Sequence, residues 1–403
     1  MSVLSQRVGN VKPSPTLAVD AKAKALKAAG KDVVNLGSGE PDFDTPKHIK
    51  KAAIKAIKEG FTKYTPAPGT PELKNAVIAK LKKDHGLEYT PDQVIVTVGG
   101  KQAFYNMAQA MLNAGDEVII PAPYWVSYTD MTILAEGKPV IVDTAEERGF
   151  KMTPAELEAA ITPQTKMVVF NSPSNPTGAA YSRDELAALG AVLEKYPHVF
   201  PVVDDIYEKI IYDGVKFTTL LEVAPSLYDR TIVLNGVSKA YAMTGWRIGY
   251  AAGPKEVIKA MGIIQSQSTS NACSIAQRAA QEALNGPQKC IKPMLKAFHE
   301  RRNFVVKRLN AMPGVHCFNP QGAFYVYPGV EGLMGKSTPE GKVIHSTLEL
   351  ADYLLESHNV AVVPGVAFGK DPYLRLSFAT SMEDLKKAMD RIETAAKLLT
   401  GTK

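Results

Sequence analysis

The chain has 403 residues, of which 45% are hydrophobic and 22% charged, and its formal net charge is +6. This length and composition predict a globular protein of two or three domains with a large core. The positive charge is spread through helical segments such as residues 47–58, which have the pattern of solvated helix faces, so we expect no binding to nucleic acid.

The cysteines argue against a disulfide-stabilised or secreted protein. Cys273, Cys290 and Cys317 are odd in number, far apart and outside any Cys-x-x-Cys motif, so we expect neither disulfides nor a metal site. The N-terminus lacks the apolar core of a signal peptide, and no apolar run approaches the length of a membrane span. We therefore expect a cytoplasmic protein that does not enter a membrane.

The N-terminal region mixes an arm, a helix and a ligand-facing loop. Residues 1–16 are polar and contain two prolines, which favours an arm over a helix. A helix is expected over 18–29 and a short strand over 33–36. The loop that follows, GSGEPDFDTP (37–46), has two glycines that allow the backbone to approach a ligand closely. A second irregular loop, YTPAPGTPEL (64–73), lies between two further helices.

The middle of the chain alternates short apolar strands with amphipathic helices. The strands are expected at residues 93–98, 117–120, 139–143, 166–171, 200–203, 231–234 and 248–252. Capping boxes at Thr153/Glu156 and Ser182/Glu185 mark two of the helix starts. Near-continuous apolar strands joined through helices predict an α/β fold, with a mostly parallel sheet that helices cover on both faces.

The C-terminal third changes character. A long helix is expected over about 289–311, with Pro293 near its start. The strands expected after it are 315–318, 323–327, 360–363 and 373–379, and the helices are 347–358 and 382–399. This pattern predicts a smaller α+β domain against which the N-terminal segment packs.

These patterns divide the chain into three segments. We expect residues 1–44 to form the N-terminal arm and part of the small domain. Residues 45–287 would form the large domain, and residues 288–403 the small C-terminal domain.

Polar residues follow the ends of successive strands, where open parallel sheets bind ligands. Gly100 and Lys101 lie where a strand meets a helix N-terminus, whose free N–H groups favour phosphate. Asn175 follows the strand at 166–171. Asp204 ends the strand that comes after it, and Tyr207 lies three residues later. We expect these groups to converge on one cleft.

The stretch NGVSKAYAMTGWRIGY (235–250) joins the last two strands of the sheet and carries Lys239 and Arg247. A lysine with a lowered pKa forms a Schiff base with a carbonyl, and the planar fork of an arginine clamps a phosphate. Together they point to a phosphorylated aldehyde cofactor, pyridoxal 5′-phosphate. The alternative is a solvated turn, because both residue types are mostly exposed.

Pyridoxal chemistry gives the strand-end residues separate tasks. The cofactor needs a carboxylate partner for its ring nitrogen to act as an electron sink, and Asp204 fits, with Asp205 as its competitor. Tyr207 and Asn175 suit the ring oxygen, and Trp125 is placed to pack on the ring. Taken singly, Asn175 is a turn former before a proline and Trp125 is a core residue.

Six motifs occur in an order that resembles the class I aminotransferases of pyridoxal-phosphate fold type I. They are YTPAPGTPELK (64–74), PAPYWVSY (121–128), NSPSNPTG (171–178), DDIY (204–207), SKAYAMTGWRIGY (238–250) and YLRLSFA (373–379). Together they cover nearly the whole chain. VKPSPT (11–16), GSGEPDFDTP and NGVSKAYAMTGWR are most similar to the bacterial aspartate aminotransferase branch, which includes prephenate aminotransferases.

The resemblance implies catalytic and cofactor-binding roles. Lys239 would hold the cofactor in a Schiff base and carry the substrate's Cα proton, while Asp204 would pair with the ring nitrogen. The remaining cofactor contacts would come from Tyr207, Asn175, Trp125, Arg247 and the backbone of Gly100 and Lys101. Tyr64 would reach the phosphate from a neighbouring subunit, which makes the enzyme a homodimer with active sites at the subunit interface.

The resemblance also implies a substrate site. Arg375 would bind the α-carboxylate, aided by the Gly39 backbone and Asn175, with Trp125 nearby, and the small domain would close over the substrate. In the branch that this chain resembles, a lysine in the VKPS segment reaches the distal carboxylate, and Lys12 matches it. The other branch uses a basic residue in the helix after GGK, where this chain has Gln109.

One position departs from the family. Many members have a hydroxyl residue three positions before the lysine that contacts the phosphate, and here that position is Gly236. Ser238 would replace it only in part.

The expected reaction is transfer of the amino group of L-aspartate to 2-oxoglutarate in two half-reactions, a ping-pong scheme. The alternatives are a prephenate or aromatic amino-acid aminotransferase, a β-lyase or decarboxylase on the same fold, and a non-catalytic ligand-binding module. A Rossmann dehydrogenase is disfavoured because no Gly-x-Gly-x-x-Gly follows the first strand of the sheet.

Overall fold

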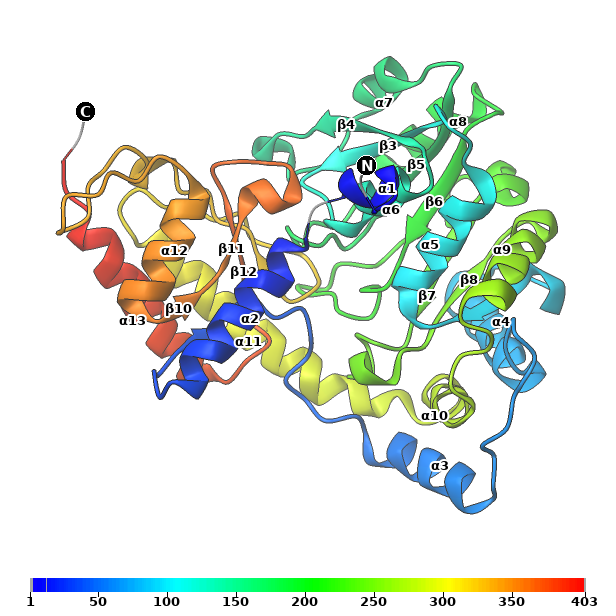
Figure 1. Ribbon diagram of the computed structural model, residues 1–403. Helices are drawn as coiled ribbons and strands as arrows, with labels where there is room; N and C mark the ends of the chain where they lie inside the picture. Colours follow the sequence, from blue (N-terminus) through cyan, green and yellow to red (C-terminus); the bar gives the residue numbers. More distant parts are fainter. Residues whose placement is uncertain (1–2, 12, 402–403) are drawn as a thin grey trace.

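The computed structural model describes residues 3–11 and 13–401. A large part surrounds a central sheet, and a smaller part to one side is built from both ends of the chain (Figure 1). Among the described residues, no helix has both the length and the apolar character to cross a membrane.

The large part alternates strands and helices. Its strands are β2 (Val94–Thr97), β3 (Glu117–Ala122), β4 (Lys138–Asp143), β5 (Thr165–Asn171), β6 (Phe200–Asp204), β7 (Ile232–Gly236) and β8 (Gly249–Ala252). Its helices are α3 (Lys47–Lys58), α4 (Pro71–His85), α5 (Gly99–Met111), α6 (Ser127–Leu134), α7 (Pro154–Ala160), α8 (Arg183–Glu194), α9 (Lys255–Ser268) and α10 (Ser274–Asn285).

The central sheet has the strand order β2-β8-β7-β6-β5-β3-β4. All neighbours pair in parallel except β8, which is antiparallel to both β2 and β7. Consecutive residues such as Val202 and Val203 belong to cores on opposite faces of the sheet, and both are buried. Burial on both faces explains why the strands read as continuous apolar runs. The predicted α/β class is confirmed.

The starts of α7 and α8 show how local sequence sets element boundaries. The Thr153 hydroxyl accepts from the Glu156 N–H at 3.2 Å, and the Glu156 carboxylate accepts from the Thr153 N–H at 2.8 Å. Ser182 and Glu185 form the same reciprocal pair. Both capping boxes satisfy backbone donors that would otherwise lack partners in the helix.

The small part joins the two ends of the chain. Its elements are α2 (Pro15–Ala28), β1 (Val34–Asn35), α11 (Ile291–Asn310), β9 (Tyr325–Val326), α12 (Thr347–His358), β10 (Val360–Ala361), β11 (Val363–Pro364), β12 (Leu374–Ser377) and α13 (Met382–Leu398). β12 pairs antiparallel with β11 and β9, and β1 pairs parallel with β10. α11 runs from beside α10 into this part (Figure 1).

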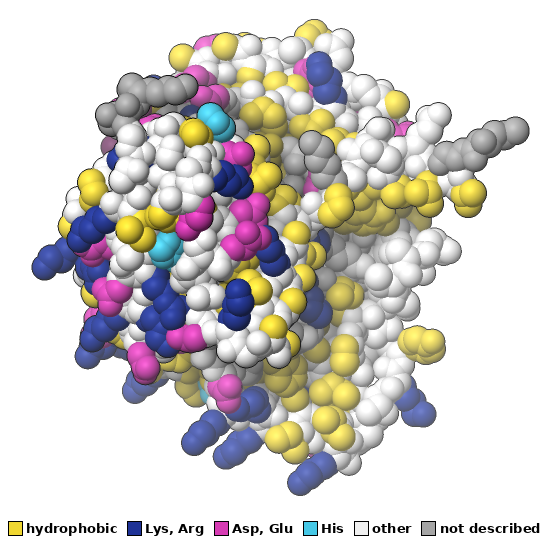
Figure 2. Space-filling view, turned by 60° about the vertical axis from the view of Figure 1, so that its left-hand side comes forward, with side chains coloured by type: hydrophobic (Ala, Val, Ile, Leu, Met, Phe, Trp, Pro, Cys, Tyr) yellow, Lys and Arg dark blue, Asp and Glu magenta, His cyan; other side chains and the backbone are white. Residues whose placement is uncertain are grey.

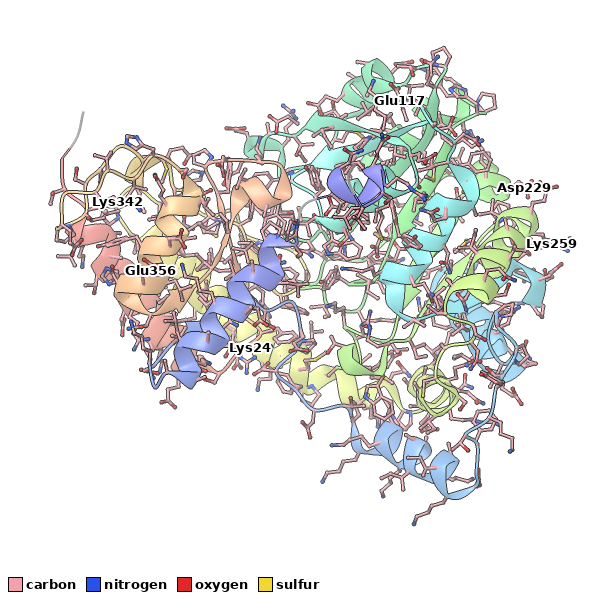
Figure 3. The ribbon with its side chains drawn as sticks, in the orientation of Figure 1. Lys24, Glu117, Asp229, Lys259, Lys342 and Glu356 are labelled. Atoms are coloured by element: carbon pink, nitrogen blue, oxygen red, sulfur yellow. The ribbon has the colours of Figure 1, made fainter. Side chains whose placement is uncertain are left out.

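Ion pairs hold the N-terminal helix on the small part. Lys22 of α2 contacts Asp352 and Glu356 of α12, each at 2.8 Å, and Glu356 is seen beside α2 in Figure 3. On the face shown in Figure 2, cationic and anionic side chains are interspersed over this part of the molecule.

The structure corrects two expectations about local structure. The strand predicted at 315–318 forms only an isolated bridge between His316 and Gly329. The Asn310 side chain instead bonds both the N–H and the carbonyl of Cys317, which takes the groups that a strand partner would need. The N-terminal arm also contains a short helix, α1 (Gln6–Gly9), that lies against α6.

We retain the domain boundaries at 44/45 and 287/288 as a proposal. Packing supports it, because Phe43 lies against the apolar cluster of the small part, whereas Ile49 lies in the core of the large part. At the other boundary the packing changes a few residues later than 287/288, because Ile291 still packs in the large core and Met294 packs in the small one.

Candidate active site

A cavity of about 440 Å³ lies at the carboxyl ends of β5, β6 and β7, between the two parts of the chain. The sequence-predicted residues that line it are Gly39, Gly100, Lys101, Trp125, Asn175, Asp204, Tyr207, Ser238, Lys239, Arg247 and Arg375. Parallel strands end at the same edge of a sheet, which brings these distant residues together.

Two predicted site residues are not part of this group. Tyr64 does not line the cavity and is 91% exposed on the surface of the chain. Lys12 lies outside the described residues.

Lys239 sits in the cavity after the end of β7. Its ammonium group donates to the carbonyl of Gly39 and lies 5.8 Å from the centroid of the Tyr207 ring. Burial, with the positive charges of Arg375 and Arg247, lowers the pKa of Lys239 to about 8. A substantial fraction of this amine is therefore neutral near pH 8, as a nucleophile or a proton acceptor must be.

The structure separates Asp204 from its competitor Asp205. Asp204 faces the cavity and accepts from the Tyr128 hydroxyl at 2.6 Å and from the Ile206 N–H at 3.3 Å. Burial raises the pKa of Asp204, while these two donors act in the opposite direction. Asp205 instead bonds the Thr219 hydroxyl at 2.8 Å and does not line the cavity.

Arg375 lies on β12 at the opposite wall. Its Nη1 donates to the Asn175 amide oxygen at 3.1 Å and its Nη2 to the Gly37 carbonyl at 2.6 Å. The guanidinium lies between two aromatic rings, 4.7 Å from the centroid of Tyr325 and 5.0 Å from that of Phe368. Its Nε is buried and has no hydrogen-bond partner among residues 3–11 and 13–401. The side chain is held in place by two of its five N–H donors, and its Nε is left without any partner in the described chain.

The far end of the cavity is suited to a phosphate. α5 begins at Gly99, so the backbone N–H groups of its first turn lack partners within the helix. A Cβ on Gly99, where φ is +77°, would collide with the Arg247 guanidinium. Ser238 is buried beside them. Glycine thus allows an arginine and a helix N-terminus to reach the same space.

Trp125 lines the cavity between α5 and α6. The Lys101 ammonium lies 5.4 Å from the centroid of its ring, and the Tyr128 ring meets it edge-on at 5.1 Å. Gln109, at the position that is basic in the other branch, lies outside the cavity and donates to the Leu134 carbonyl at 3.1 Å.

The sequence interpretation missed two tyrosines that contact the predicted residues. Tyr128 bonds Asp204, and the Tyr325 hydroxyl lies 2.9 Å from that of Tyr207. Tyr128 lies within the PAPYWVSY motif, so its position offered a signal. Tyr325 lies in an apolar strand of the C-terminal third, where only the fold reveals its neighbour.

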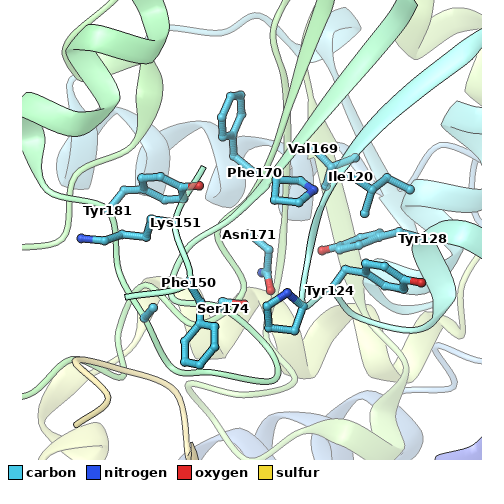
Figure 4. Close-up of a pocket in the computed structure, with 13 residues that line it drawn as sticks. Ile120, Tyr124, Tyr128, Phe150, Lys151, Val169, Phe170, Asn171, Ser174 and Tyr181 are labelled. Carbon is cyan, nitrogen blue, oxygen red and sulfur yellow. The ribbon is translucent and has the colours of Figure 1, made fainter. Parts of the chain in front are cut away.

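A second, smaller cavity of about 30 Å³ adjoins the first at Asn171 and Tyr128, with room for a water molecule or two. Figure 4 shows Asn171 at its centre, with Tyr124 and Tyr128 on one side and Tyr181 and Lys151 on the other. Asn171 and Tyr128 line both cavities. The Asn171 amide also donates to the Asp204 carbonyl at 3.0 Å, which fixes the end of β6.

The donor set fits pyridoxal 5′-phosphate at both of its ends. Arg247, Ser238 and the first turn of α5 would hold the phosphate, and Asp204 would hold the ring nitrogen. A buried carboxylate with a raised pKa suits a partner that shares a proton. A buried lysine, a strand-end carboxylate and a phosphate cradle on a mostly parallel sheet are the features of a pyridoxal-phosphate-dependent enzyme.

Comparison with known proteins identifies the family. Residues 31–392 match the family "Aminotransferase class I and II". The chain is 58% identical over 393 residues to an aspartate/prephenate aminotransferase from Cereibacter sphaeroides, with 98% of each chain covered.

Solved structures give the same result. The aspartate aminotransferase of Rhizobium meliloti has a TM-score of 0.96 at 50% identity, covering 99% of this chain and 100% of the other. The aspartate aminotransferase of Thermus thermophilus with maleate has a TM-score of 0.91 at 45% identity, covering 98% and 100%. The chain belongs to the class I and II aminotransferase family and is an aminotransferase that uses pyridoxal 5′-phosphate, as predicted.

Proposed function

We propose that the enzyme transfers the amino group of L-aspartate to 2-oxoglutarate, giving oxaloacetate and L-glutamate. The observation that carries this proposal is Arg375, which is 2% exposed and has a free Nε donor in the part of the chain that the structure describes. A buried guanidinium with an unpaired donor is costly until a ligand pairs with it. A carboxylate matches its planar fork best, and every proposed substrate carries an α-carboxylate.

The proposed chemistry uses the cavity residues in separate roles. Bound pyridoxal 5′-phosphate supplies the electron sink that accepts charge from the substrate Cα. The neutral Nζ of Lys239 removes the Cα proton, and the Gly39 carbonyl, which already accepts from this amine, steadies it. With the cofactor bound, Asp204 would keep a proton at the ring nitrogen, and the Tyr207 hydroxyl and Asn175 amide would hold the ring oxygen.

Substrate choice rests on the second carboxylate. The relatives named aspartate/prephenate aminotransferase and the structural neighbour with bound maleate support a dicarboxylate. We assign recognition of the distal carboxylate to Lys12. Ser14 and Thr16, described residues that follow Lys12 closely in the chain, line the cavity, which supports this assignment.

A panel of amino donors and 2-oxo acceptors tests this proposal. We expect aspartate to give the highest kcat/KM as the donor with 2-oxoglutarate. Aromatic donors ranking above aspartate would overturn the assignment, and release of pyruvate and ammonia without an acceptor would indicate a lyase. The Lys12→Ala variant should raise KM for dicarboxylates selectively, and an unchanged KM would refute the role of Lys12.

Prephenate is the second candidate substrate, because the names of relatives at 58% and 56% identity include it. It also carries two carboxylates, so it would use Arg375 and Lys12 in the same way. Glutamate-dependent amination of prephenate, measured beside aspartate turnover, distinguishes a dual enzyme from a dedicated one.

The covalent site is tested by borohydride reduction of the holoenzyme and peptide mass mapping. We expect the mass of the cofactor on Lys239. The same mass on another lysine, or on none, would overturn the site assignment.

We also propose a homodimer in which Tyr64 completes the phosphate site of the partner subunit. Tyr64 is 91% exposed, and an open hollow of about 610 Å³ beside Arg247 could receive a loop from a second chain. Co-expression of Lys239→Ala with Tyr64→Ala chains should restore activity, because one site of the mixed dimer is then intact. Activity no higher than that of either variant alone would contradict a shared site.

We propose the cytoplasm as the compartment of this enzyme. Cys273, Cys290 and Cys317 are all free thiols, which fits a reducing environment.

A further inference from the structure

Tyr325 has no role in the function proposed above, yet it lies between Arg375 and Tyr207. It is 1% exposed and lies on β9, opposite Ser377 of β12. Arg375 is two residues from Ser377 and therefore shares its face of the sheet. The diagonal neighbour across an antiparallel pair is within reach of an aromatic side chain, so the register itself places the Tyr325 ring beside the guanidinium.

The ring and the hydroxyl of Tyr325 make different contacts. The ring centroid lies 4.7 Å from the Arg375 guanidinium, and the hydroxyl lies 2.9 Å from the Tyr207 hydroxyl. A Cβ on Gly39 would come within 3.2 Å of the same hydroxyl, so the loop that bonds Lys239 also packs closely on it. One side chain thus contacts both the residue proposed to bind substrate and one proposed to bind cofactor.

Counting protons gives the hydrogen bond a direction. A tyrosine hydroxyl has one proton and can accept from a second donor. If Tyr207 donates its proton to the cofactor's ring oxygen, Tyr325 must donate to the oxygen of Tyr207. Burial raises the pKa of both phenols, so both are neutral and able to donate. Donation from Tyr325 polarises Tyr207 and makes it a stronger donor.

We infer that Tyr325 is a positioning residue that strengthens the hydrogen bond from Tyr207 to the cofactor and stacks under Arg375 to orient it toward the substrate carboxylate. This inference rests on the proposed roles of Tyr207 and Arg375. The hydroxyl of Tyr325 would act on cofactor binding, and its ring on substrate binding. Two substitutions separate these two effects.

The test uses the holoenzyme and two readouts that do not depend on turnover. The first is the pH midpoint at which the absorbance of the bound cofactor titrates without substrate. The second is the Kd for maleate, a dicarboxylate with neither amino nor oxo group, followed by the same absorbance. Tyr325→Phe removes only the hydroxyl, whereas Tyr325→Leu also removes the ring.

We expect Tyr325→Phe to raise the titration midpoint by about 0.3–0.7 pH unit, because a weaker donor stabilises the deprotonated, more anionic form less. Its maleate Kd should change less than about twofold. Tyr325→Leu should show the same shift and weaken maleate binding by about 5–30-fold, as for loss of a buried cation–π contact. Circular dichroism checks that both variants are folded.

The Tyr207→Phe variant separates failure of this inference from failure of the proposed function. It should shift the midpoint further than Tyr325→Phe, and the double variant should match Tyr207→Phe alone, since Tyr325 acts through Tyr207. A shift in Tyr207→Phe with none in Tyr325→Phe would overturn the role of Tyr325 only. No shift in either variant would refute the role of Tyr207 and this inference with it.

Discussion

The turn at residues 204–208 separates two buried clusters of charge that differ in how they are paired. The open cluster, Lys239, Arg375 and Asp204, faces the cavity. The closed cluster lies on the other side, where its charged groups bond one another. It consists of Lys80, Asp84, His85, Glu208 and Glu222.

The closed cluster is satisfied by its own members. Glu208 accepts from Lys80 and from His85 Nε2 at 2.6 Å, and His85 Nδ1 lies 2.8 Å from Glu222. Asp84, His85 and Glu208 lie close enough together to ligate a metal, but Lys80 already bonds both carboxylates. Burial raises the pKa of Glu208, and the opposing charges of Lys80 and His85 outweigh it and lower the pKa to about 2.

The open cluster has hydrogen-bonding and charged groups that are not paired within the cluster. The Arg375 Nε is free among the described residues, and Lys239 has a carbonyl as its partner where a carboxylate would hold it charged. Buried charge therefore has two uses in this protein. A fully paired group stabilises the fold, whereas a group left partly unpaired provides binding energy for a ligand. The predictions below separate these two uses.

The largest effect is expected for Lys239→Ala. Loss of the only proposed proton carrier should lower kcat by about 10⁴-fold or more. The melting temperature should stay unchanged or rise, because a buried amine with a lowered pKa costs folding free energy. Steady-state kinetics and calorimetry of the apoprotein measure the two quantities. A fall in melting temperature would show that the open cluster also supports the fold.

Glu208→Gln should have the opposite effect, a loss of stability. Removing this carboxylate takes the shared partner from Lys80 and His85, so that Lys80 keeps the Asp84 carboxylate, at 3.5 Å, and His85 keeps that of Glu222. Loss of one member of such a buried network costs about 3–5 kcal/mol of unfolding free energy. Urea denaturation of the apoprotein measures it. The double variant Lys80→Met/Glu208→Leu is the control, and it should recover most of the loss because both charges are gone. A loss of similar size in the double variant would mean that packing, and not charge, sets the cost.

The rate at which the apoprotein binds pyridoxal 5′-phosphate should depend on pH through Lys239. Only the neutral amine attacks the aldehyde, so the rate should rise about tenfold per pH unit below pH 8 and level off above it. Stopped-flow absorbance measures the rate. In Arg375→Met a nearby positive charge is lost, so the profile should move to higher pH. An unmoved profile would exclude Arg375 as a cause of the lowered pKa.

Asp205→Asn should have the smallest effect, and its sign depends on pH. Burial, with the nearby Glu208, raises the pKa of Asp205 to about 7, so the native state binds this proton more tightly than the unfolded chain. Stability from this group is therefore full below pH 4 and is lost as pH rises to 7. The variant should be more stable at pH 8, by at most about 4 kcal/mol for a shift from 3.8 to about 7, and unchanged at pH 4. Equal gains at both values would contradict the titration of Asp205.

The sequence could place the site but not orient its side chains. Asp204, Asn175 and Lys239 were predictable because the ends of parallel strands share an edge of the sheet. Which of Asp204 and Asp205 faces the cavity depends on how the chain turns at the end of β6, and the sequence does not show that turn. Tyr325 was not predictable, since its bond to Tyr207 joins residues that are far apart in the chain. The strand expected at 315–318 fails because a side chain, Asn310, takes the backbone groups that a neighbouring strand would use.

The pairing of β1 with β10 has a consequence for synthesis of the chain. Val34 pairs with Val360, so about 325 residues must be translated before β1 meets its partner strand. At 5–20 residues per second this takes roughly 15–65 s. Val33, Val34 and Leu36, all buried in the folded protein, remain without their C-terminal partners throughout this time. An apolar segment that is translated long before β10 is among the last to be covered, so a chaperone that binds nascent chains should bind this segment.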